Sequence, residues 1–273
     1  MADLLEKGRG DQYANYSRIS TKNSSGANFV SDGVSIAMWS GPRNISTAMM
    51  YAFDNREDCH ATDEPLYANF LQSTGTPHPG AQEVMENHEA DIGVVVSYLT
   101  GPIPHGMPIW YQKHMCHHVM DGANISWIDG LANCFLIRNP REVLLSLSKI
   151  TDSIDLRATG LPQQIRIIDH VSMVSGRIPP IVDSADILEN PGAVLTKLCE
   201  SVGVPFSEQM LSWDPGPRKC DGIWAKYWYD SVRLTSGFVP PRPREGELGI
   251  RLSEVLEEAM PIYQELWEMR LSV

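Results

Sequence analysis

Residues 34–50 read VSIAMWSGPRNISTAMM, and the expected fold is built outward from this stretch. An apolar run breaks at Gly41-Pro42, hydroxyl residues follow, and apolar residues then recur with helical spacing. This order is typical of a buried strand, a tight turn and the N-terminus of a helix. The first amide groups of a helix have no partner within it, and the helix dipole favours an anion beside them. With Arg43 in the turn and hydroxyl donors at Ser46 and Thr47, the stretch predicts a loop that binds a phosphate or sulfate group.

The composition excludes some classes of partner. The chain has 273 residues and a formal net charge of −12 at pH 7. A general nucleic-acid binder would usually present a basic face, whereas a small anionic ligand needs only a few local cations. No apolar run approaches the roughly 20 residues that span a membrane. We therefore expect a small-molecule partner and neither nucleic acid nor a membrane, and the sequence leaves the oligomeric state open.

The N-terminal residues and the cysteines bear on organisation and location. Residues 1–30 are rich in small and polar residues and lack the apolar core of a secretory signal, so we expect a flexible arm followed by a single domain at residues 31–273. The five cysteines are widely spaced and form no CxxC pair: Cys59, Cys116, Cys134, Cys199 and Cys220. This usage is typical of reduced thiols in a cytoplasmic protein without a disulfide framework.

Strand-like and helix-like segments alternate along the chain. Further strands are expected at residues 59–65, 108–113, 133–138 and 180–183. Helical segments are expected at residues 66–71, 81–99, 140–150, 162–175, 191–202 and 252–269. The alternation predicts an α/β fold with a parallel central sheet flanked by helices on both faces. Ligands of such folds bind beyond the C-terminal ends of the strands, so the turn at Gly41, Asp63, Glu64, Lys113 and Arg138 should meet at one edge.

The turn at Gly41 lacks the residues of a loop that binds ATP or GTP. That loop reads G-x-x-x-x-G-K-S/T, with the Lys on the terminal phosphates and the Ser or Thr on Mg²⁺. Counting from Gly41, Ser46 stands at the second Gly, Thr47 at the Lys and Ala48 at the metal-binding hydroxyl. A P-loop kinase or other phosphotransferase is therefore the alternative function and not the leading one.

The remaining pattern resembles the 5′-phosphosulfate loop of the sulfotransferase family. In that family a strand is followed by Pro-Arg/Lys-Ser-Gly-Ser/Thr-Thr, and the matching residues here are Pro42, Arg43, Ser46 and Thr47. Asn44 and Ile45 replace the usual Ser-Gly, and Ile45 is the larger departure because a β-branched residue restricts the backbone. Ile45 also favours a third alternative, a non-catalytic anion-binding relative. The resemblance implies a P-loop nucleotide-binding fold that binds 3′-phosphoadenylyl sulfate through Gly41, Pro42, Arg43, Asn44, Ile45, Ser46 and Thr47.

Two later segments resemble further signatures of the same family. Residues 135–146 read FLIRNPREVLLS, which resembles the Arg, Asn/Asp-Pro and Ser pattern that binds the 3′-phosphate of the donor. Arg138 and Ser146 have the spacing of that pattern, and an Arg beside a helix N-terminus makes charge-assisted bonds to a dianion. Residues 218–224 read RKCDGIW and resemble a loop that begins Arg-Lys-Gly, so the resemblance adds Arg218 and Lys219 to the donor site.

The resemblance also implies a reaction and roles for several residues. Sulfotransferases move a sulfonate group in line from 3′-phosphoadenylyl sulfate to a hydroxyl or amine of the acceptor, without a metal ion. The reaction needs a base and nearby cations. Glu64 is the expected base because residues 63–67, DEPLY, resemble the acid-centred segment of carbohydrate sulfotransferases, and cations should lower its pKa. Arg43 would stand on the leaving side, Lys113 near the sulfonate and acceptor, and His114 is the second candidate base.

Two further groups of residues are conspicuous, a histidine cluster, in which a His could serve at the acceptor site or as a base, and three tryptophans. On a helix, His114 and His118 would share a face as zinc ligands do, with Cys116 and His117 between them. The segment lacks a third ligand motif and the Glu of the metalloprotease pattern, so no metal site is predicted. Three tryptophans are expected in the core or in a pocket wall: Trp213, Trp224 and Trp228.

Overall fold

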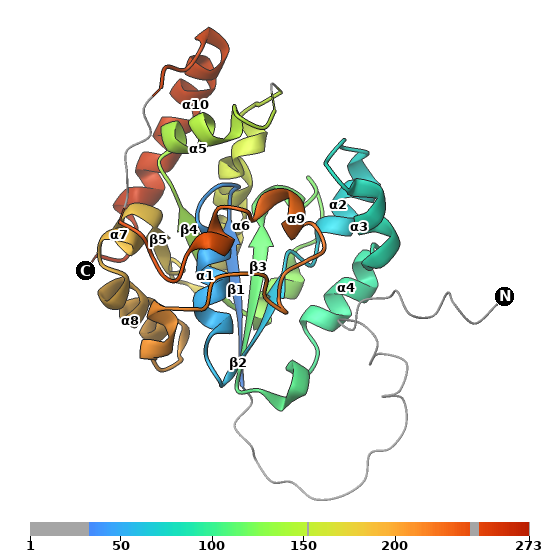
Figure 1. Ribbon diagram of the computed structural model, residues 1–273, viewed down its shortest axis with the longest axis vertical. Helices are drawn as coiled ribbons and strands as arrows, with labels where there is room; N and C mark the ends of the chain where they lie inside the picture. The colour runs from blue at the N-terminus through green and yellow to red at the C-terminus, as the bar shows by residue number, and fades with distance from the viewer. Residues whose placement is uncertain (1–32, 152, 241–245, 273) are drawn as a thin grey trace, which may run out of the picture.

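Five parallel strands form the central sheet of the computed structural model, which describes residues 33–151, 153–240 and 246–272 (Figure 1). The strands are β1 (Val34–Ser40), β2 (Cys59–Asp63), β3 (Ile109–Met115), β4 (Ala132–Ile137) and β5 (Ile181–Asp183). Their order is β2-β3-β1-β4-β5, and each neighbouring pair is parallel. The predicted α/β fold is confirmed. The loop after β1 lies where the strand order reverses, which is the usual ligand position. The arm expected at residues 1–30 lies outside the described residues.

Ten α-helices are found among the described residues. Their bounds are α1 (Ser46–Asp54), α2 (Tyr67–Thr74), α3 (Ala81–Asn87), α4 (Ile92–Leu99), α5 (Pro140–Leu147), α6 (Leu161–Ser175), α7 (Ser184–Glu189), α8 (Pro191–Val202), α9 (Ala225–Trp228) and α10 (Ile250–Glu268). In this described part of the chain, none is long and apolar enough to cross a membrane.

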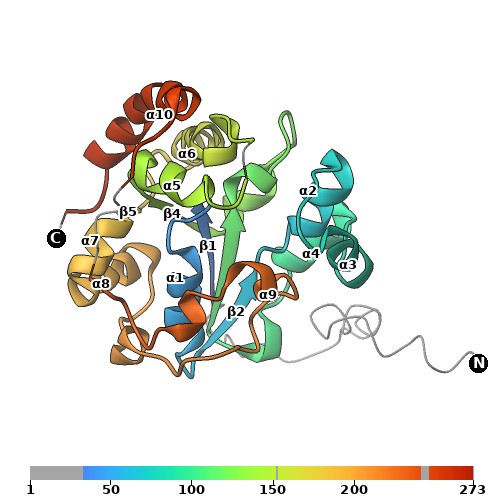
Figure 2. The same cartoon turned by 45° about the horizontal axis from the view of Figure 1, so that its top comes forward.

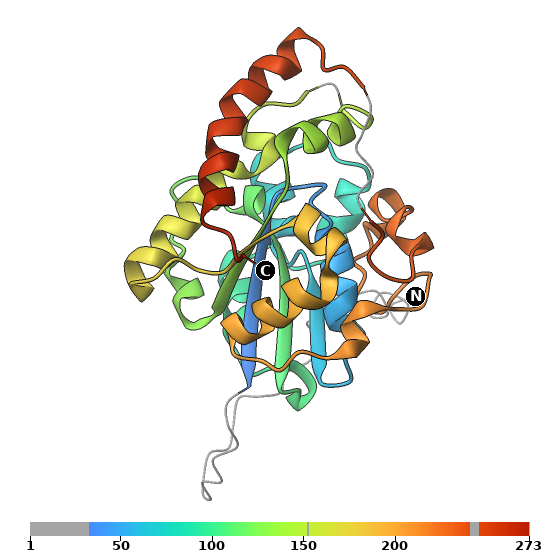
Figure 3. The ribbon, with the colours of Figure 1, turned by 90° about the vertical axis from the view of Figure 1, so that its left-hand side faces the viewer.

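Helices cover both faces of the sheet because its strands are apolar on both. Along β1, Ile36 and Met38 face one side and Ala37 and Trp39 the other, since side chains alternate along a strand. The first pair packs in a core with α1 and α8, and the second in a core with α4, α6 and α10. The turned views show α1 and α8 on one side of the sheet and α6 and α10 on the other (Figure 2, Figure 3).

One predicted helix is wrong, and the helix on which His114 and His118 would have shared a face is absent. The helix expected at residues 81–99 is divided into α3 and α4, because His88 is extended and Asp91 caps a new helix by accepting from the amides of Gly93 and Val94. The segment from His114 to His118 is not an α-helix. His114 belongs to β3, and a 3₁₀ turn follows at Cys116–His118, so His114 and His118 do not share a helix face.

Gly41 lets the loop after β1 pack directly against another turn. A Cβ at Gly41 would lie 2.2 Å from the carbonyl oxygen of Thr159. Gly160 has a positive φ of 78°, and a Cβ there would lie 2.9 Å from the Cα of Gly41. The two glycines therefore permit a backbone-to-backbone contact that fixes the loop against the start of α6.

Residues 212–240 cross over α1 and reach the C-terminal end of β2 (Figure 1). Arg218 pairs with Asp54 of α1 at 2.6 Å. Asp221 accepts a hydrogen bond from Tyr51 of α1 at 2.8 Å and pairs with Arg233 at 2.6 Å. These contacts hold the segment in place, and the segment brings Tyr229 to the edge where ligands of this fold class bind.

Candidate active site

A cavity of about 1480 Å³ opens at the C-terminal edge of the sheet. It is lined by the loop at residues 42–48 after β1, by Glu64 after β2, by Lys113 near the end of β3 and by Arg138 after β4. The sequence therefore predicted correctly that these segments meet at one edge. Small-molecule pockets usually measure about 300–1,000 Å³, so this cavity is larger than most of them.

The loop of the cavity is held in a strained conformation. Arg43 and Ile45 have φ values of 62° and 60°, and Ile45 is the residue immediately before α1. The left-handed region costs a non-glycine residue about 1–2 kcal/mol, and it is least favourable for a β-branched one. Ile45 thus adopts a conformation that a glycine would take more easily. Strain of this kind persists where surrounding contacts hold the backbone, and it is concentrated at functional sites.

Hydrogen bonds join this loop to the end of β4. The Asn44 amide donates to the carbonyl of Leu136 at 3.2 Å. Arg138 Nη1 donates to the carbonyl of Arg43 at 2.8 Å, and Arg43 Nε donates to Ser146 Oγ at 2.9 Å. The two segments that the sequence singled out as anion-binding, about one hundred residues apart, are therefore in direct contact.

A buried charged cluster lies beside the loop. Lys113 Nζ contacts Asp63 Oδ1 at 2.8 Å, Glu64 Oε1 at 2.5 Å and the Tyr229 hydroxyl at 2.6 Å. An ammonium group has three N–H donors, so these three contacts use all of them. Asp63 also accepts from the amide of Gly222 at 3.0 Å. Lys113 is thus a fixed cation that holds Glu64 in one orientation.

Burial, a second carboxylate and the Lys113 ammonium group all act on the pKa of Glu64. Burial raises the pKa of Glu64 and the charge of Asp63 raises it further, which outweighs the opposing effect of Lys113. The expectation of a lowered pKa for Glu64 is therefore wrong. Burial disfavours the charge of Lys113, but Asp63 and Glu64 hold its pKa above the ordinary value. A carboxylate with a raised pKa is a stronger base near neutral pH.

His114 lies on the other face of the sheet. Side chains alternate along β3, so Lys113 faces the cavity and His114 the opposite core. The His114 ring stacks on Trp39 with centroids 4.4 Å apart, and its Nε2 lies 3.1 Å from Gln112 Oε1. Burial lowers its pKa to about 3. The structure does not bring this second candidate base to the cavity.

The His114→Gln variant should weaken the dependence of stability on pH. Unfolded His114 takes up a proton near pH 6.5, whereas the folded pKa is about 3. Neutral His114 therefore contributes its full share of the unfolding free energy above about pH 6.5. This contribution is lost as the pH falls toward 3. Between about pH 4 and 6, the slope of unfolding free energy against pH should fall by about 1.4 kcal/mol per pH unit.

Urea unfolding at fixed pH values measures this slope. His170→Gln is the matched control, because His170 is partly exposed and paired with Asp129 at 2.6 Å. An unchanged slope in His114→Gln would contradict the placement of a neutral imidazole in this core.

Four predicted donor-binding residues do not line the cavity, and one of them, Ser146, is buried and accepts a hydrogen bond from Arg43. Gly41 lies beneath the loop, in contact with Thr159 and Gly160. Arg218 donates to Asp54 Oδ2 at 2.6 Å and to Asn55 Oδ1 at 3.3 Å at the C-terminal end of α1, and Lys219 beside it is exposed. The resemblance of residues 218–224 to a donor-binding loop is thus not accompanied by a position at the cavity.

Sequence reasoning missed several residues that the structure brings to the site. Tyr229 completes the charged cluster, and Tyr67, Phe70 and His78 line the cavity beside Glu64. His117 and His118, from the histidine cluster noted in the sequence, line it as well. The aromatic stretch around Tyr229 was the available signal. Of its tryptophans, Trp228 lines the cavity, whereas Trp224 and the earlier Trp213 are buried in the core, as predicted.

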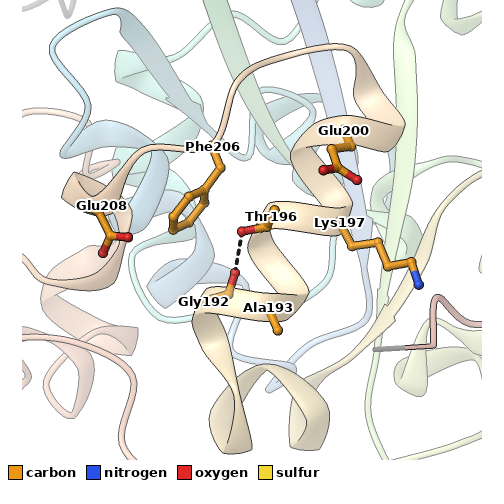
Figure 4. Close-up of a pocket in the computed structure, with 7 residues that line it drawn as sticks. All are labelled: Gly192, Ala193, Thr196, Lys197, Glu200, Phe206 and Glu208. Carbon is orange, nitrogen blue, oxygen red and sulfur yellow. Dashed lines mark hydrogen bonds between the residues drawn. The ribbon is translucent and has the colours of Figure 1, made fainter.

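A second hollow of about 420 Å³ lies along α8 (Figure 4). Gly192, Thr196, Lys197 and Phe206 are among the residues that line it, and Thr196 donates to the carbonyl of Gly192 at 2.7 Å. It includes none of the predicted site residues, so the candidate site is the larger cavity.

Comparison with known proteins identifies the protein family of this chain. A model of the sulfotransferase domain matches residues 34–269. The chain therefore belongs to the sulfotransferase domain family.

Two curated relatives from Arabidopsis thaliana are similar to the chain. It is 34% identical over 230 residues to branched-chain-amino-acid aminotransferase-like protein 2, covering 84% of this chain and 40% of the relative. It is 32% identical over 231 residues to protein 1 of the same name, with the same coverage. The chain thus spans about two fifths of the length of these relatives. Among solved structures, a sulfotransferase from Alicyclobacillus acidocaldarius is 11% identical with a TM-score of 0.46, covering 87% of this chain and 96% of that one.

Proposed function

We propose that this protein transfers a sulfonate group from 3′-phosphoadenylyl sulfate to a hydroxyl or amine of a small-molecule acceptor, with Glu64 as the base. The observation that carries the proposal is the direct contact between two segments that are expected to bind anions, the loop after β1 and the segment after β4. Arg138 donates to the Arg43 carbonyl at 2.8 Å, and Arg43 donates to Ser146 at 2.9 Å. Adjacent motifs of this kind suit a ligand with phosphate groups at the 5′ and 3′ positions of one adenosine.

The residues of the loop fit the 5′ end of such a donor. The first-turn amides of α1, from Ser46 onward, have no partner within the helix and favour an anion. Arg43 adds positive charge at the same place, and Arg138 with Ser146 would hold the 3′-phosphate. When bound, the donor supplies the sulfonate group.

The position of Glu64 at the cavity and its raised pKa support the proposed role. Its hydrogen bonds to Lys113 and Tyr229 both fall on Oε1, and among the described residues Oε2 has no hydrogen-bond partner. Its raised pKa increases its affinity for a proton from an acceptor hydroxyl. Lys113 would act as a positioning residue, because its three donors hold Asp63, Glu64 and Tyr229.

Two finer expectations belong to this proposal. Arg43 and Arg138 supply positive charge next to the proposed phosphate sites, so we propose that transfer needs no added metal ion. The five cysteines are free thiols, which suits a reducing location such as the cytoplasm.

Adenosine 3′,5′-bisphosphate should stabilise the protein in a metal-free buffer. At about 100 times its dissociation constant, a ligand adds about 2.7 kcal/mol, which raises the melting temperature of a domain of this size by about 5–10 °C. Thermal unfolding with the bisphosphate, with adenosine 5′-monophosphate and with Mg²⁺-ATP measures this. No shift with the bisphosphate would count against the proposal, and a shift with Mg²⁺-ATP alone would favour a phosphotransferase.

Arg138→Ala sharpens the same experiment. Losing a charge-assisted hydrogen bond costs about 1.5–3 kcal/mol, so the preference for the bisphosphate over the monophosphate should fall about 10–150-fold. Because both ligands are measured in the same variant, a general disturbance of the loop affects both and cancels in the ratio of their dissociation constants. Arg177→Ala, at an exposed position, is the matched control and should keep the preference.

A further inference from the structure

Two consecutive carboxylates, Asp63 and Glu64, reach the same ammonium group, and the backbone bends sharply between them. Consecutive side chains of a strand point to opposite faces, so the residue after Asp63 would normally turn away from Lys113. Glu64 instead has a φ of 38°, in the left-handed region that favours glycine. Its amide donates to the Lys113 carbonyl at 3.0 Å, which fixes the bend. Strain of this kind is concentrated at functional sites, so the carboxylate pair is a candidate for a functional role.

The two carboxylates differ in their access to the cavity. The Asp63 side chain is 1% exposed and does not line the cavity. The Glu64 side chain is 12% exposed and does line it. Glu64 is therefore the carboxylate that a molecule in the cavity can contact, and Asp63 is enclosed by the protein.

The Tyr229 hydroxyl has a single proton, and its neighbours decide which carboxylate receives it. Lys113 Nζ at 2.6 Å and Trp224 Nε1 at 3.2 Å can only donate, so the hydroxyl oxygen accepts from both. For its own proton, Asp63 Oδ2 at 2.8 Å is closer than Glu64 Oε1 at 3.4 Å. Burial raises the pKa of Tyr229 well above its ordinary value, and the two carboxylates raise it further, so the hydroxyl keeps its proton. Tyr229 therefore donates to Asp63.

Hydrogen bonds consequently stabilise a negative charge on Asp63 more than on Glu64. Asp63 accepts from Lys113 at 2.8 Å and from the Gly222 amide at 3.0 Å. The Tyr229 hydroxyl is its third donor. Among the described residues, the one short hydrogen bond to Glu64 comes from Lys113 at 2.5 Å. Hydrogen bonds to a carboxylate favour its charged form, so the surroundings of the two groups separate their roles.

Other titratable groups near the cluster are uncharged close to pH 7. Burial raises the pKa of Tyr67 and Cys220 and lowers the pKa of His88, His117 and His118. These groups add no charge that would draw a proton to one carboxylate or the other. The distribution of a proton within the pair therefore depends on the hydrogen bonds.

We propose that Tyr229 is a positioning residue that, together with the Gly222 amide, keeps the negative charge of the pair on Asp63, so that a proton entering the cluster binds Glu64. The proposal deepens the proposed function and rests on Glu64 as its base. In the reaction the acceptor O–H bond breaks and its proton binds Glu64 Oε2. The acceptor oxygen forms a bond to sulfur as the bond from sulfur to the donor phosphate breaks, and that electron pair leaves with the phosphate. Asp63 and Tyr229 exchange no proton in this step.

Carbon-13 NMR of the side-chain carboxyl groups tests where the proton binds. The full chain is labelled with ¹³C in its Asp and Glu residues and titrated from about pH 9 to about pH 4. Over the first protonation step of the pair, the Glu64 carboxyl signal should move, and the Asp63 signal should move less than about a tenth as far. Equal movement of the two signals, or movement of Asp63 first, would overturn the proposal. This readout needs no variant and no turnover.

A variant pair tests the part played by Tyr229. Tyr229→Phe removes the third donor of Asp63, and loss of a hydrogen bond to a charged group should shift the proton distribution about 10-fold or more toward Asp63. The Asp63 signal should then move in the first protonation step. Tyr227→Phe, at a residue that is 41% exposed, is the matched control and should keep the parental distribution. An unchanged distribution in Tyr229→Phe, or the same change in both variants, would refute the positioning role.

Adenosine 3′,5′-bisphosphate added to the same samples separates this proposal from the proposed function. Its dissociation constant should agree within about twofold between the parent and Tyr229→Phe, because the proposed donor residues follow β1 and β4. Failure of the bisphosphate to bind the parent would overturn the proposed function and leave the proton distribution measurable. Bisphosphate binding lost in Tyr229→Phe alone would indicate a general disturbance of the cavity and would contradict a role limited to the carboxylate pair.

Discussion

The Glu64→Gln variant is expected to transfer sulfonate about 10²–10⁴-fold more slowly than the parent, because general-base catalysis contributes a factor of that size. Glutamine has nearly the same shape and can still accept the hydrogen bond from Lys113, but it cannot remove a proton. Binding of adenosine 3′,5′-bisphosphate should stay within about twofold, since the proposed donor residues lie at the ends of β1 and β4. Turnover of an accepted substrate and calorimetric titration measure the two quantities.

The fold of this variant should be intact. It removes one of two carboxylates that share a single ammonium group, so the free energy of unfolding should be unchanged or slightly higher. Glu83→Gln, on the surface of α3, is the matched control for activity. In the parent, activity should fall as the pH drops through the raised pKa of Glu64, because the base must be ionised. A Glu64→Gln variant with more than about a tenth of the parental rate would mean that another group removes the proton.

Lys113→Met should produce the largest loss of stability. Methionine fills a similar volume but leaves Asp63 and Glu64 buried without a cation, and breaking a buried pair in this way costs about 3–5 kcal/mol. The melting temperature should fall by about 6–20 °C. The effect should be largest at neutral pH and smaller near pH 5, because protonation of a carboxylate relieves the repulsion. Chemical denaturation at both pH values measures it.

Two further variants test the origin of that loss. Adding Glu64→Gln to Lys113→Met should recover part of the stability, since only Asp63 then remains without a cation. Lys226→Met breaks an exposed pair with Glu83 and should cost less than about 1 kcal/mol. Equal losses at Lys113 and Lys226, or no recovery in the double variant, would contradict the buried-cluster explanation.

The elements that the sequence predicted well have local signals at both ends. Helix α8 was predicted at residues 191–202 and lies at Pro191–Val202, because Asn190 caps its start and Gly203 ends it with a φ of 80°. The strand before Arg138 likewise stops at Asn139-Pro140. The meeting of four strand ends at one edge follows from the parallel sheet alone, so the general position of the site was also predictable.

The details that sequence reasoning missed depend on contacts that no local pattern contains. Tyr229 completes a cluster with Asp63, which lies 166 residues earlier. The strand expected to end at Lys113 continues to Met115, and this extension assigns His114 to the opposite face. Ile45 takes a backbone conformation that its own side chain disfavours, so only the surrounding loop contacts can specify it.

The contribution of residues 212–240 to the site makes the Glu64 cluster depend on the docking of a distant segment. All five strands and the loop after β1 lie before residue 184 in the chain, whereas Tyr229 belongs to a later segment. The Arg43–Ser146 and Arg138–Arg43 contacts do not involve this segment. The contacts of Tyr229 with Lys113 and of the Gly222 amide with Asp63 do involve it. The Glu64 cluster is therefore complete only when residues 212–240 are docked.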